Sequence, residues 1–237
     1  SSAASDVYKR QLYDHLGGGF ARFSVDAEWR VPHFEKMLYD NALLLHIYLD
    51  VWLNLRREHD EVVIRETCDF LLDEMRNSEG GFLCAIDADS EGQEGRYYIW
   101  TADEIQRALS ETFPEDAIQR FKRCYGVTDK GNFEQANVLC LTQDLEEFAA
   151  ESGLTQAELL SELSRAKLLL LDARRKRVPP SKDAKVLTNW NGLAIEAVAR
   201  AGRVFNEFRY VEAASQAAEF LMKHCQRGPG ELLHGHC

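Results

Sequence analysis

Apolar side chains recur along the chain in two alternating kinds of segment. Residues 34–55 are apolar on nearly every side, whereas residues 60–76 carry a narrower apolar stripe. The same succession returns later, with residues 190–205 apolar all round and residues 210–224 amphipathic. A helix that is apolar on several faces is buried between layers, and a helix with one stripe lies outside them. The pattern therefore predicts helical hairpins whose inner helices ring a centre and whose outer helices shield them.

A glycine-rich break follows the first outer helix. Glu79-Gly80-Gly81-Phe82 ends the helical pattern, and two short apolar runs follow it, "FLCAI" and "RYYIW". The polar insert "DADSEGQEG" separates these runs. Short apolar runs on either side of a turn-rich segment are typical of paired strands, so we predict a short β-hairpin here.

Capping boxes mark the start of two further helices. Thr101 is followed three residues later by Glu104, and Thr155 by Glu158. In this arrangement the threonine hydroxyl and the glutamate carboxylate each satisfy a backbone N–H at a helix start. The second of these helices is predicted to run to about Arg177, before a pair of prolines ends it.

An internal repeat is visible in two pairs of segments. "GGGFARFSVDAEW" at 17–29 and "EGGFLCAIDADSEG" at 79–92 share Gly-Gly-Phe followed by acidic residues. "PHFEKMLYDNALLL" and "TNWNGLAIEAVAR" share an aromatic and polar start before an apolar helix. Repeated helical hairpins with loops at one end are typical of a toroid. The predicted fold class is all-α, a toroid of helical hairpins with a short β-hairpin insert.

Charge and cysteine usage exclude several classes of function. A net charge of −11 and a pI of about 5.2 argue against nucleic acid as a partner. Six cysteines form no Cys-x-x-Cys pair and match neither a zinc site nor a compact disulfide scaffold, so reduced thiols in the cytoplasm are expected. No stretch reaches the roughly 20 apolar residues of a membrane span. We predict no metal, no cofactor and no membrane contact.

The first residues differ in character from the rest. "SSAASDVYKRQ", residues 1–11, is small, polar and unpatterned, and is interpreted as an adaptor-derived scar. The expected domain organisation is therefore this scar, followed by one incomplete toroid domain over residues 12–237.

The stretch "WRVPHFEKMLYDNALLL" places many ionisable groups ahead of a run of leucines. Pro32 suits an early helical position, which would set His33, Lys36 and Asp40 on one face of the helix that follows. Polar groups at the start of a buried helix are costly unless they pair or meet ligand and water. They could cap and pair a structural helix, but we favour a site. A histidine in a cleft can carry a proton to or from a carbon beside a carbonyl.

The acidic segment Asp87–Gly92 starts like a calcium-binding loop. The twelfth position of such a loop requires a bidentate glutamate, and Tyr98 stands there, so a calcium loop is not expected. The carboxylates could instead bind sugar hydroxyls or act as an acid/base pair, as glycoside hydrolysis requires. The structural alternative is a solvated turn whose aspartates bond nearby backbone N–H groups.

A second polar and aromatic start is "TNWNG". Asn189 can cap a helix, Trp190 offers a flat face that suits a sugar ring, and Asn191 can donate and accept toward hydroxyls. The alternative is a capped inner helix with a tryptophan in the core.

Three blocks of sequence resemble a known family. "DHLGGGFARFSVDAEWRVPHFEKMLYDNA", "AIDADSEGQEGRYYIWT" and "KVLTNWNGLAIEA" are similar to the thioredoxin-domain-containing family of bacterial YyaL-type and spermatogenesis-associated thioredoxin-like proteins. The resemblance covers residues 12–237. It implies an (α/α)6 toroid related in fold to six-hairpin glycosidases and N-acylglucosamine 2-epimerases. It also implies an upstream thioredoxin-like domain in cis and further hairpins, both outside this chain.

Two functions follow from these observations as hypotheses. The first is a carbohydrate-related toroid that carries out epimerase-like proton transfer on a sugar-like substrate. The second is a non-catalytic scaffold or binding module for the thioredoxin-like redox domain. For the first, we predict catalytic roles for His33, Asp87 and Asp89. The predicted substrate-binding residues are Arg22, Glu35, Lys36, Tyr39, Asp40, Asn41, Glu91, Trp100, Asn189, Trp190 and Asn191.

Overall fold

The structure, a computed structural model, describes residues 12–27, 29, 31–228 and 230–236. The predicted scar at residues 1–11 lies outside these residues. The chain forms two compact units, to which the described residues belong as follows. Unit 1 contains the described residues within 12–17, 23–34 and 89–180, and unit 2 those within 18–22, 35–88 and 181–236.

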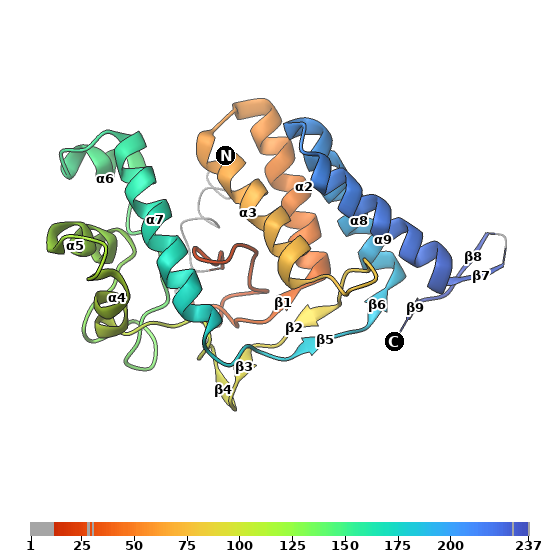
Figure 1. Ribbon diagram of the computed structural model, residues 1–237, viewed down its shortest axis with the longest axis horizontal. Coiled ribbons are helices and arrows are strands. Elements are labelled where there is room, and N and C mark those ends of the chain that lie inside the picture. The colour runs from red at the N-terminus through yellow and green to blue at the C-terminus, as the bar shows by residue number, and fades with distance from the viewer. Residues whose placement is uncertain (1–11, 28, 30, 229, 237) are drawn as a thin grey trace. The chain divides into compact units, whose positions relative to one another are not determined.

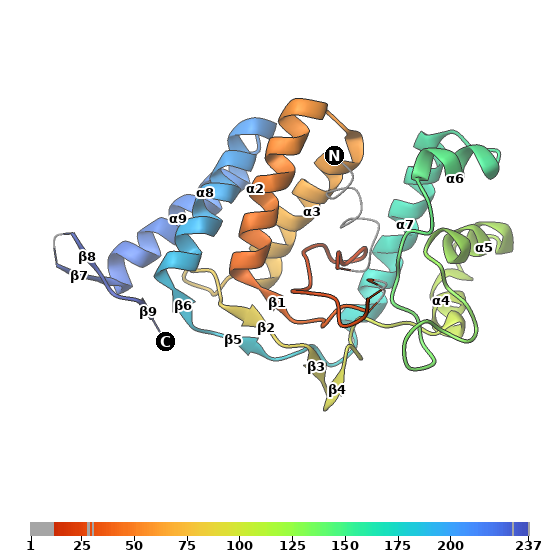
Figure 2. The ribbon, with the colours of Figure 1, turned by 180° about the vertical axis from the view of Figure 1, so that it is seen from behind.

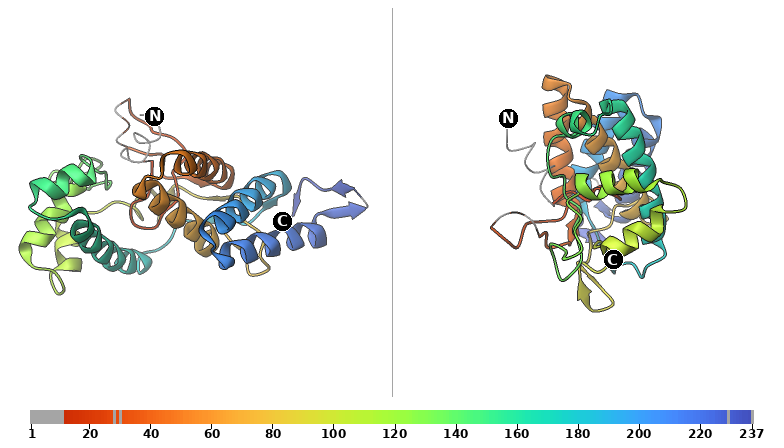
Figure 3. Two further views of the ribbon diagram at one scale, coloured as in Figure 1. Left: turned by 90° about the horizontal axis from the view of Figure 1, so that it is seen from above. Right: turned by 90° about the vertical axis from the view of Figure 1, so that its left-hand side faces the viewer.

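Two helical hairpins build unit 2 (Figure 1). The first pairs α2 (Leu38–Leu55) with α3 (Glu58–Glu74), and the second pairs α8 (Thr188–Phe205) with α9 (Phe208–His224). Helix α2 also packs against α8, so the two hairpins lie side by side. Figure 3 shows α8 and α9 running alongside each other when seen from above.

Apolar side chains fill the contact faces of these four helices. Leu49 of α2, Leu71 of α3, Val198 of α8 and Ala217 of α9 have no exposed surface. Burial of such side chains is the main favourable term in the folding of a domain of this kind. The alternation of inner and outer helices predicted from the sequence therefore corresponds to the packing of unit 2.

Short strands lie at the end of unit 2 where α2 and α8 begin (Figure 2). All strand pairings in unit 2 are antiparallel. The strands are β1 (Lys36–Met37), β2 (Ala85–Ile86) and β5 (Lys182–Asp183) in one sheet, β6 (Val186–Leu187) with β9 (Gly235–His236), and β7 (Gln226–Gly228) with β8 (Glu231–Leu232).

Unit 1 contains shorter helices packed on one long helix, α7. Its elements are β3 (Asp89–Ser90), β4 (Gln93–Glu94), α4 (Ala102–Leu109), α5 (Glu115–Cys124), α6 (Leu145–Glu151) and α7 (Gln156–Arg175). Helices α4, α5 and α6 each contact α7. The predicted capping boxes at Thr101 and Thr155 are both confirmed, with the side-chain and backbone bonds of each box formed.

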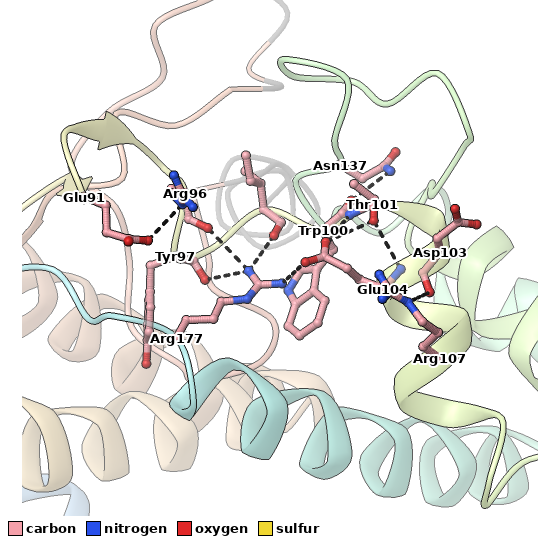
Figure 4. Close-up of polar contacts among 11 residues, drawn as sticks. Glu91, Arg96, Tyr97, Trp100, Thr101, Asp103, Glu104, Arg107, Asn137 and Arg177 are labelled. Carbon is pink, nitrogen blue, oxygen red and sulfur yellow. Dashed lines mark hydrogen bonds and ion pairs between the residues drawn. The ribbon is translucent and has the colours of Figure 1, made fainter.

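Arg177, just beyond α7, fastens the turn before α4 (Figure 4). Its guanidinium donates to the backbone carbonyls of Tyr97 at 3.1 Å and Ile99 at 2.7 Å, and to Glu104 at 3.1 Å. The same guanidinium lies over the ring of Trp100, 3.9 Å from its centroid. This one side chain therefore ties the end of α7 to the start of α4.

The predicted strand pairing was wrong in its partners. "FLCAI" contributes β2, which pairs with β1 and β5, whereas "RYYIW" forms turns and a single bridge from Trp100 to Asn137. The short hairpin lies instead inside the polar insert, as β3 and β4 around Glu91-Gly92. An Asp-Ser-Glu-Gly turn, with Glu91 and Gly92 both at positive φ, is a stronger hairpin signal than apolar character.

The predicted fold class is confirmed, since the chain consists of helical hairpins with short β-hairpins. None of the helices in the described residues is both long and apolar enough to cross a membrane.

The internal repeat is confirmed, and its register is the same throughout unit 2. Helices α2 and α8 start 150 residues apart, and so do α3 and α9. The pairing of Lys36 with Ile86 returns as that of Val186 with His236, again 150 residues on. Both inner helices end at a residue in the left-handed conformation, Arg56 and Asn206.

In each hairpin of the repeat, the asparagine at the fourth position of the inner helix hydrogen-bonds both backbone groups of a phenylalanine. Asn41 accepts from Phe20 N at 2.7 Å and donates to Phe20 O at 3.1 Å. Asn191 accepts from Phe82 N at 2.9 Å and donates to Phe82 O at 2.9 Å. We call this arrangement the asparagine clamp. It satisfies the donor and the acceptor of a buried residue at once.

Glycines let each clamped segment approach the outer helix. A Cβ on Gly19 would lie 2.4 Å from the Phe70 ring, and one on Gly81 would lie 2.8 Å from the Phe220 ring. Phe70 and Phe220 are themselves 150 residues apart. The glycines shared by the two Gly-Gly-Phe segments are therefore needed because α3 or α9 lies too close to the segment for a side chain there.

Candidate functional site

The segment before α2 is extended, which corrects the predicted helix start. Phe34 has a φ of 62°, Lys36 pairs with Ile86 in β1, and the helix begins at Leu38. His33, Lys36 and Asp40 therefore do not share a helical face. The positive φ of Phe34 and the strand pairing of Lys36 override the proline signal, because tertiary contacts outweigh local helix preference.

In unit 2, Arg22 contacts three of the predicted binding residues, Glu35, Tyr39 and Asp40. Its guanidinium lies 3.5 Å from Glu35 Oε2 and 3.9 Å from Asp40 Oδ2. A side-chain hydrogen bond with Tyr39, and then the nearby carboxylates of Glu35 and Asp40, raise the pKa of Arg22. The Arg22 backbone N–H also donates to Glu35 O at 2.9 Å, which fixes the two segments together.

Asp40 is a half-buried carboxylate beside Arg22. Burial raises its pKa, against the opposing effects of Arg22 and Tyr39. Its Oδ2 atom is buried and has no hydrogen-bond partner among the described residues. A half-buried carboxylate with a raised pKa can accept a hydrogen bond or exchange a proton.

An aromatic pair lies next to Asp40 along α2. The rings of Tyr39 on α2 and Trp190 on α8 have centroids 4.8 Å apart and planes at 54°. Both side chains are partly exposed. Partly exposed aromatic faces suit the C–H face of a sugar ring. We name Arg22, Glu35, Tyr39, Asp40 and Trp190 the polar–aromatic cluster.

Three other predicted binding residues hold the cluster in place instead of facing solvent. Asn41 and Asn191 have no exposed surface, and their amides are bonded to backbone in the asparagine clamp. Lys36 is also buried, donates to Gly18 O at 2.8 Å and lies over the Phe70 ring. The structure gives these three side chains positioning roles, next in sequence to Glu35, Asp40 and Trp190.

Asn189 differs from its predicted role as a cap. The residue at the N-cap of α8 is Leu187, and Asn189 lies inside the first turn with its side chain exposed. The capping role fails because β6 runs directly into the helix, leaving no loop residue for a side-chain cap.

His33 belongs to unit 1. Its ring stacks on Phe23 with centroids 4.7 Å apart, and its backbone N–H donates to Phe23 O at 2.9 Å. The Nδ1 atom is buried without a hydrogen-bond partner among the described residues. The ring is thus held against Phe23 within unit 1.

The predicted acidic residues divide between the two units. Asp87, in unit 2, accepts from Ser181 Oγ at 3.1 Å, and its N–H donates to Ser181 O at 2.9 Å. Asp89, in unit 1, pairs with Glu94 in the β3–β4 hairpin. Ser181 was missed by the sequence analysis. Its signal was the "SKDAK" segment ahead of "TNWNG", which carries β5.

The last two predicted residues have structural partners in unit 1. Glu91, at the turn of the β3–β4 hairpin, pairs with Arg96 at 3.0 Å. Trp100 is 2% exposed and covered by Arg177, so it offers no face to a ligand.

Comparison with curated proteins places most of the chain in a homologous region. It is 35% identical to spermatogenesis-associated protein 20 of Homo sapiens over 92% of this chain and 32% of that protein. It is 34% identical to the uncharacterized protein B0495.5 of Caenorhabditis elegans over 90% of this chain and 32% of that protein. The chain thus spans about a third of the length of these relatives. No family profile matches it.

Solved structures resemble the chain only loosely. A D-mannose isomerase superimposes with a TM-score of 0.34 and 14% identity over 98% of this chain and 52% of that one. Cellobiose 2-epimerase from Spirochaeta thermophila superimposes with a TM-score of 0.34 and 17% identity over 99% and 70%. Superpositions this loose carry no weight for activity.

The sequence identity to these relatives shows that the chain is homologous to them. Identity of about a third over nine-tenths of the chain is sustained across the human and nematode proteins. The chain is a homologue of spermatogenesis-associated protein 20 along the matched segment, which confirms the family resemblance of its three sequence blocks.

Proposed function

We propose that unit 2 binds a carbohydrate-like small molecule at the polar–aromatic cluster. The observation that carries this is the combination of an aromatic pair, Tyr39 and Trp190, with the ionic group of Arg22 and Asp40 next to it. Sugar-binding sites combine an aromatic face with side chains that donate to and accept from hydroxyls. Arg22 supplies donors, and the half-buried carboxylate of Asp40 supplies acceptors.

We propose proton transfer at a sugar carbon as a reaction of the complete polypeptide. His33 is the acid/base candidate, because its Nδ1 has no partner among the described residues and its ring is held by Phe23. Asp87 and Asp89 remain proposed orienting groups. In an epimerisation, the C–H bond beside a carbonyl breaks, the proton passes to the base, and a proton returns to the opposite face of the same carbon.

The binding half of the proposal is tested by ligand-dependent stability. A panel of reducing and N-acylated sugars is added to the 237-residue chain, and the free energy of unfolding is measured with each. A sugar at 100 times its dissociation constant should add about 2.7 kcal/mol. Trp190→Ala should abolish that increment, whereas Trp52→Ala, which removes a tryptophan that packs on Phe205 outside the cluster, should retain it. A panel without any stabilising sugar would contradict binding.

The catalytic half is tested with the complete polypeptide from the source DNA, in heavy water. Deuterium at the carbon beside the sugar carbonyl is followed by NMR. Incorporation that disappears in His33→Ala, while the variant unfolds at the same denaturant concentration, supports proton transfer. Undiminished incorporation in His33→Ala would exclude His33 as the base.

A scaffold role for an upstream thioredoxin-like domain is the second candidate. It is favoured by the number of predicted binding side chains, among them Lys36, Asn41 and Asn191, that are bonded to backbone. Failure of every sugar to stabilise the chain or incorporate deuterium would favour this role.

A further inference from the structure

The third copy of the Gly-Gly-Phe segment lies near the end of the chain. Gly230, Glu231 and Leu232 follow Gly80, Gly81 and Phe82 by 150 residues, the spacing of the internal repeat. Their hydrogen bonds repeat as well. Leu83 N donates to Met75 O at 2.7 Å, and Leu233 N donates to Cys225 O at 2.7 Å. The bridge between Arg76 and Phe82 likewise returns as the pairing of Gln226 with Leu232.

This equivalence fixes the direction of the Leu232 backbone groups. Successive residues of a strand point their N–H and C=O groups to opposite edges. Because Leu233 N–H points toward the chain at Cys225, the polar groups of Leu232 point the other way. At the same position in the second copy, Phe82 presents its N–H and C=O to Asn191.

Burial separates the third copy from the other two. Phe20 and Phe82 have no exposed surface, whereas Leu232 is 54% exposed and Leu233 is 40% exposed. No side chain among the described residues bonds the Leu232 backbone. An apolar strand edge of this kind is a ready-made pairing surface that proteins normally cover.

We propose that Gly230–Leu232 is the docking strand for a further helical hairpin of the same repeat, one that follows Cys237 in the longer polypeptide. An asparagine at the fourth position of its first helix would bridge the N–H and C=O of Leu232. The two asparagine clamps in this chain, Asn41 with Phe20 and Asn191 with Phe82, show the same pair of hydrogen bonds. The chain also spans only about a third of the length of its relatives, which leaves room for such a hairpin.

Glu231 adds a specificity requirement. The first two copies have Gly19 and Gly81 here, where a Cβ would meet Phe70 or Phe220 of the outer helix. Glu231 carries a Cβ, so the docking hairpin requires a side chain smaller than phenylalanine at the equivalent position of its second helix. The hairpins α2–α3 and α8–α9 are therefore excluded as occupants of this strand.

The test is hydrogen exchange on the complete polypeptide, recovered from the source DNA, and on the 237-residue chain. The amide of Leu232 should exchange at least tenfold more slowly in the complete polypeptide, while the amide of Phe82 is slow in both. Asn→Ala at the fourth position of the next inner helix should restore fast exchange at Leu232 and leave Phe82 slow. Asn191→Ala in the 237-residue chain should accelerate Phe82 and calibrates the size of the effect.

Two outcomes would overturn the docking strand. One is an equal rate of exchange at Leu232 in the two proteins. The other is a reading frame that ends at Cys237 or continues without an asparagine at that helical position. Neither outcome depends on whether the chain binds a sugar, so this proposal stands or fails separately from the proposed function.

Discussion

At the residue scale, Asn41 and Asn191 show why a polar residue in an apolar helix need not be a ligand contact. Each amide makes three bonds to backbone, two of them to a single phenylalanine and one to the residue before its own helix, Met37 O or Leu187 O. The sequence placed both residues in a site because it showed polar side chains at a buried helix start. It could not show that the chain would supply a backbone partner from a distant segment.

Removing one asparagine clamp should lower the free energy of unfolding, because the buried N–H and C=O that it bonded then have no partner. Asn191→Ala removes the partners of the Phe82 N–H and C=O, which are buried, so the free energy of unfolding should fall by about 1–3 kcal/mol for each group. Urea denaturation measures this. Asn189→Ala, two residues away and exposed, should change the free energy by less than about 0.5 kcal/mol. Equal effects of the two substitutions would argue against the clamp.

His15 gives unit 1 a sensitivity to acid. The imidazole is fully buried between Tyr13 and Tyr125, and burial lowers its pKa to about 3. The folded state keeps it neutral while the unfolded chain binds a proton below about pH 6.5. Stability should therefore fall as pH decreases from 6.5 toward 3, by at most about 1.4 kcal/mol per pH unit.

The measurement is hydrogen exchange of unit 1 amides under native conditions between pH 4 and 7, corrected for the intrinsic pH dependence of exchange. His15→Leu should flatten the decline in stability, since it removes the group that takes up the proton. A decline of the same steepness in that variant would place its origin elsewhere.

At the element scale, hydrophobic periodicity and capping chemistry predicted the six helices α2, α3, α4, α7, α8 and α9, but not α5 or α6. Both capping boxes and both hairpins of unit 2 are present, because these signals act over four or five neighbouring residues. Of the strands, only β2 lies in a run that was predicted as a strand. Each strand has only two or three residues, and the partners of β1, β2, β5 and β6 lie far away in sequence. Lys36 pairs with Ile86, and no local pattern encodes that distance.

The same limit explains how much of the candidate site could be predicted. Arg22, Tyr39, Asp40 and Trp190 do come together, from segments that the sequence already singled out. Trp100 was chosen for its aromatic character, yet Arg177 covers it. The side chain that buries a residue lies elsewhere in the chain, so exposure could not be predicted from the residue itself.

Glycine substitutions test the packing of the clamped segment against its outer helix. Gly81→Ala would place a Cβ 2.8 Å from the Phe220 ring, which should lower the free energy of unfolding by about 1–3 kcal/mol. Gly192→Ala, inside α8 with nothing within 4 Å, should raise it by about 0.5–1 kcal/mol through higher helix propensity. Denaturant midpoints of the two variants should move in opposite directions. A neutral Gly81→Ala would show that the ring of Phe220 can yield.

At the scale of the whole molecule, exposed apolar side chains predict self-association. Leu43 and Ile47 of α2 are 45% and 51% exposed, one turn apart on the same side of the helix. Exposed apolar patches on soluble proteins are usually covered by another surface. Sedimentation of the 237-residue chain should therefore become heavier as concentration rises. Ile47→Lys should reduce this dependence, and a wild-type chain that remains monomeric throughout would contradict the prediction.

The asparagine clamp also bears on how such a chain can be enlarged. The carboxamide presents an N–H and a C=O to the phenylalanine, as a peptide group would, so each clamp replaces a neighbouring strand over a single residue. A polypeptide built in this way can gain hairpins by duplication without widening any sheet. Its strands stay too short to serve as templates for intermolecular pairing, so growth in length brings little added risk of fibril formation.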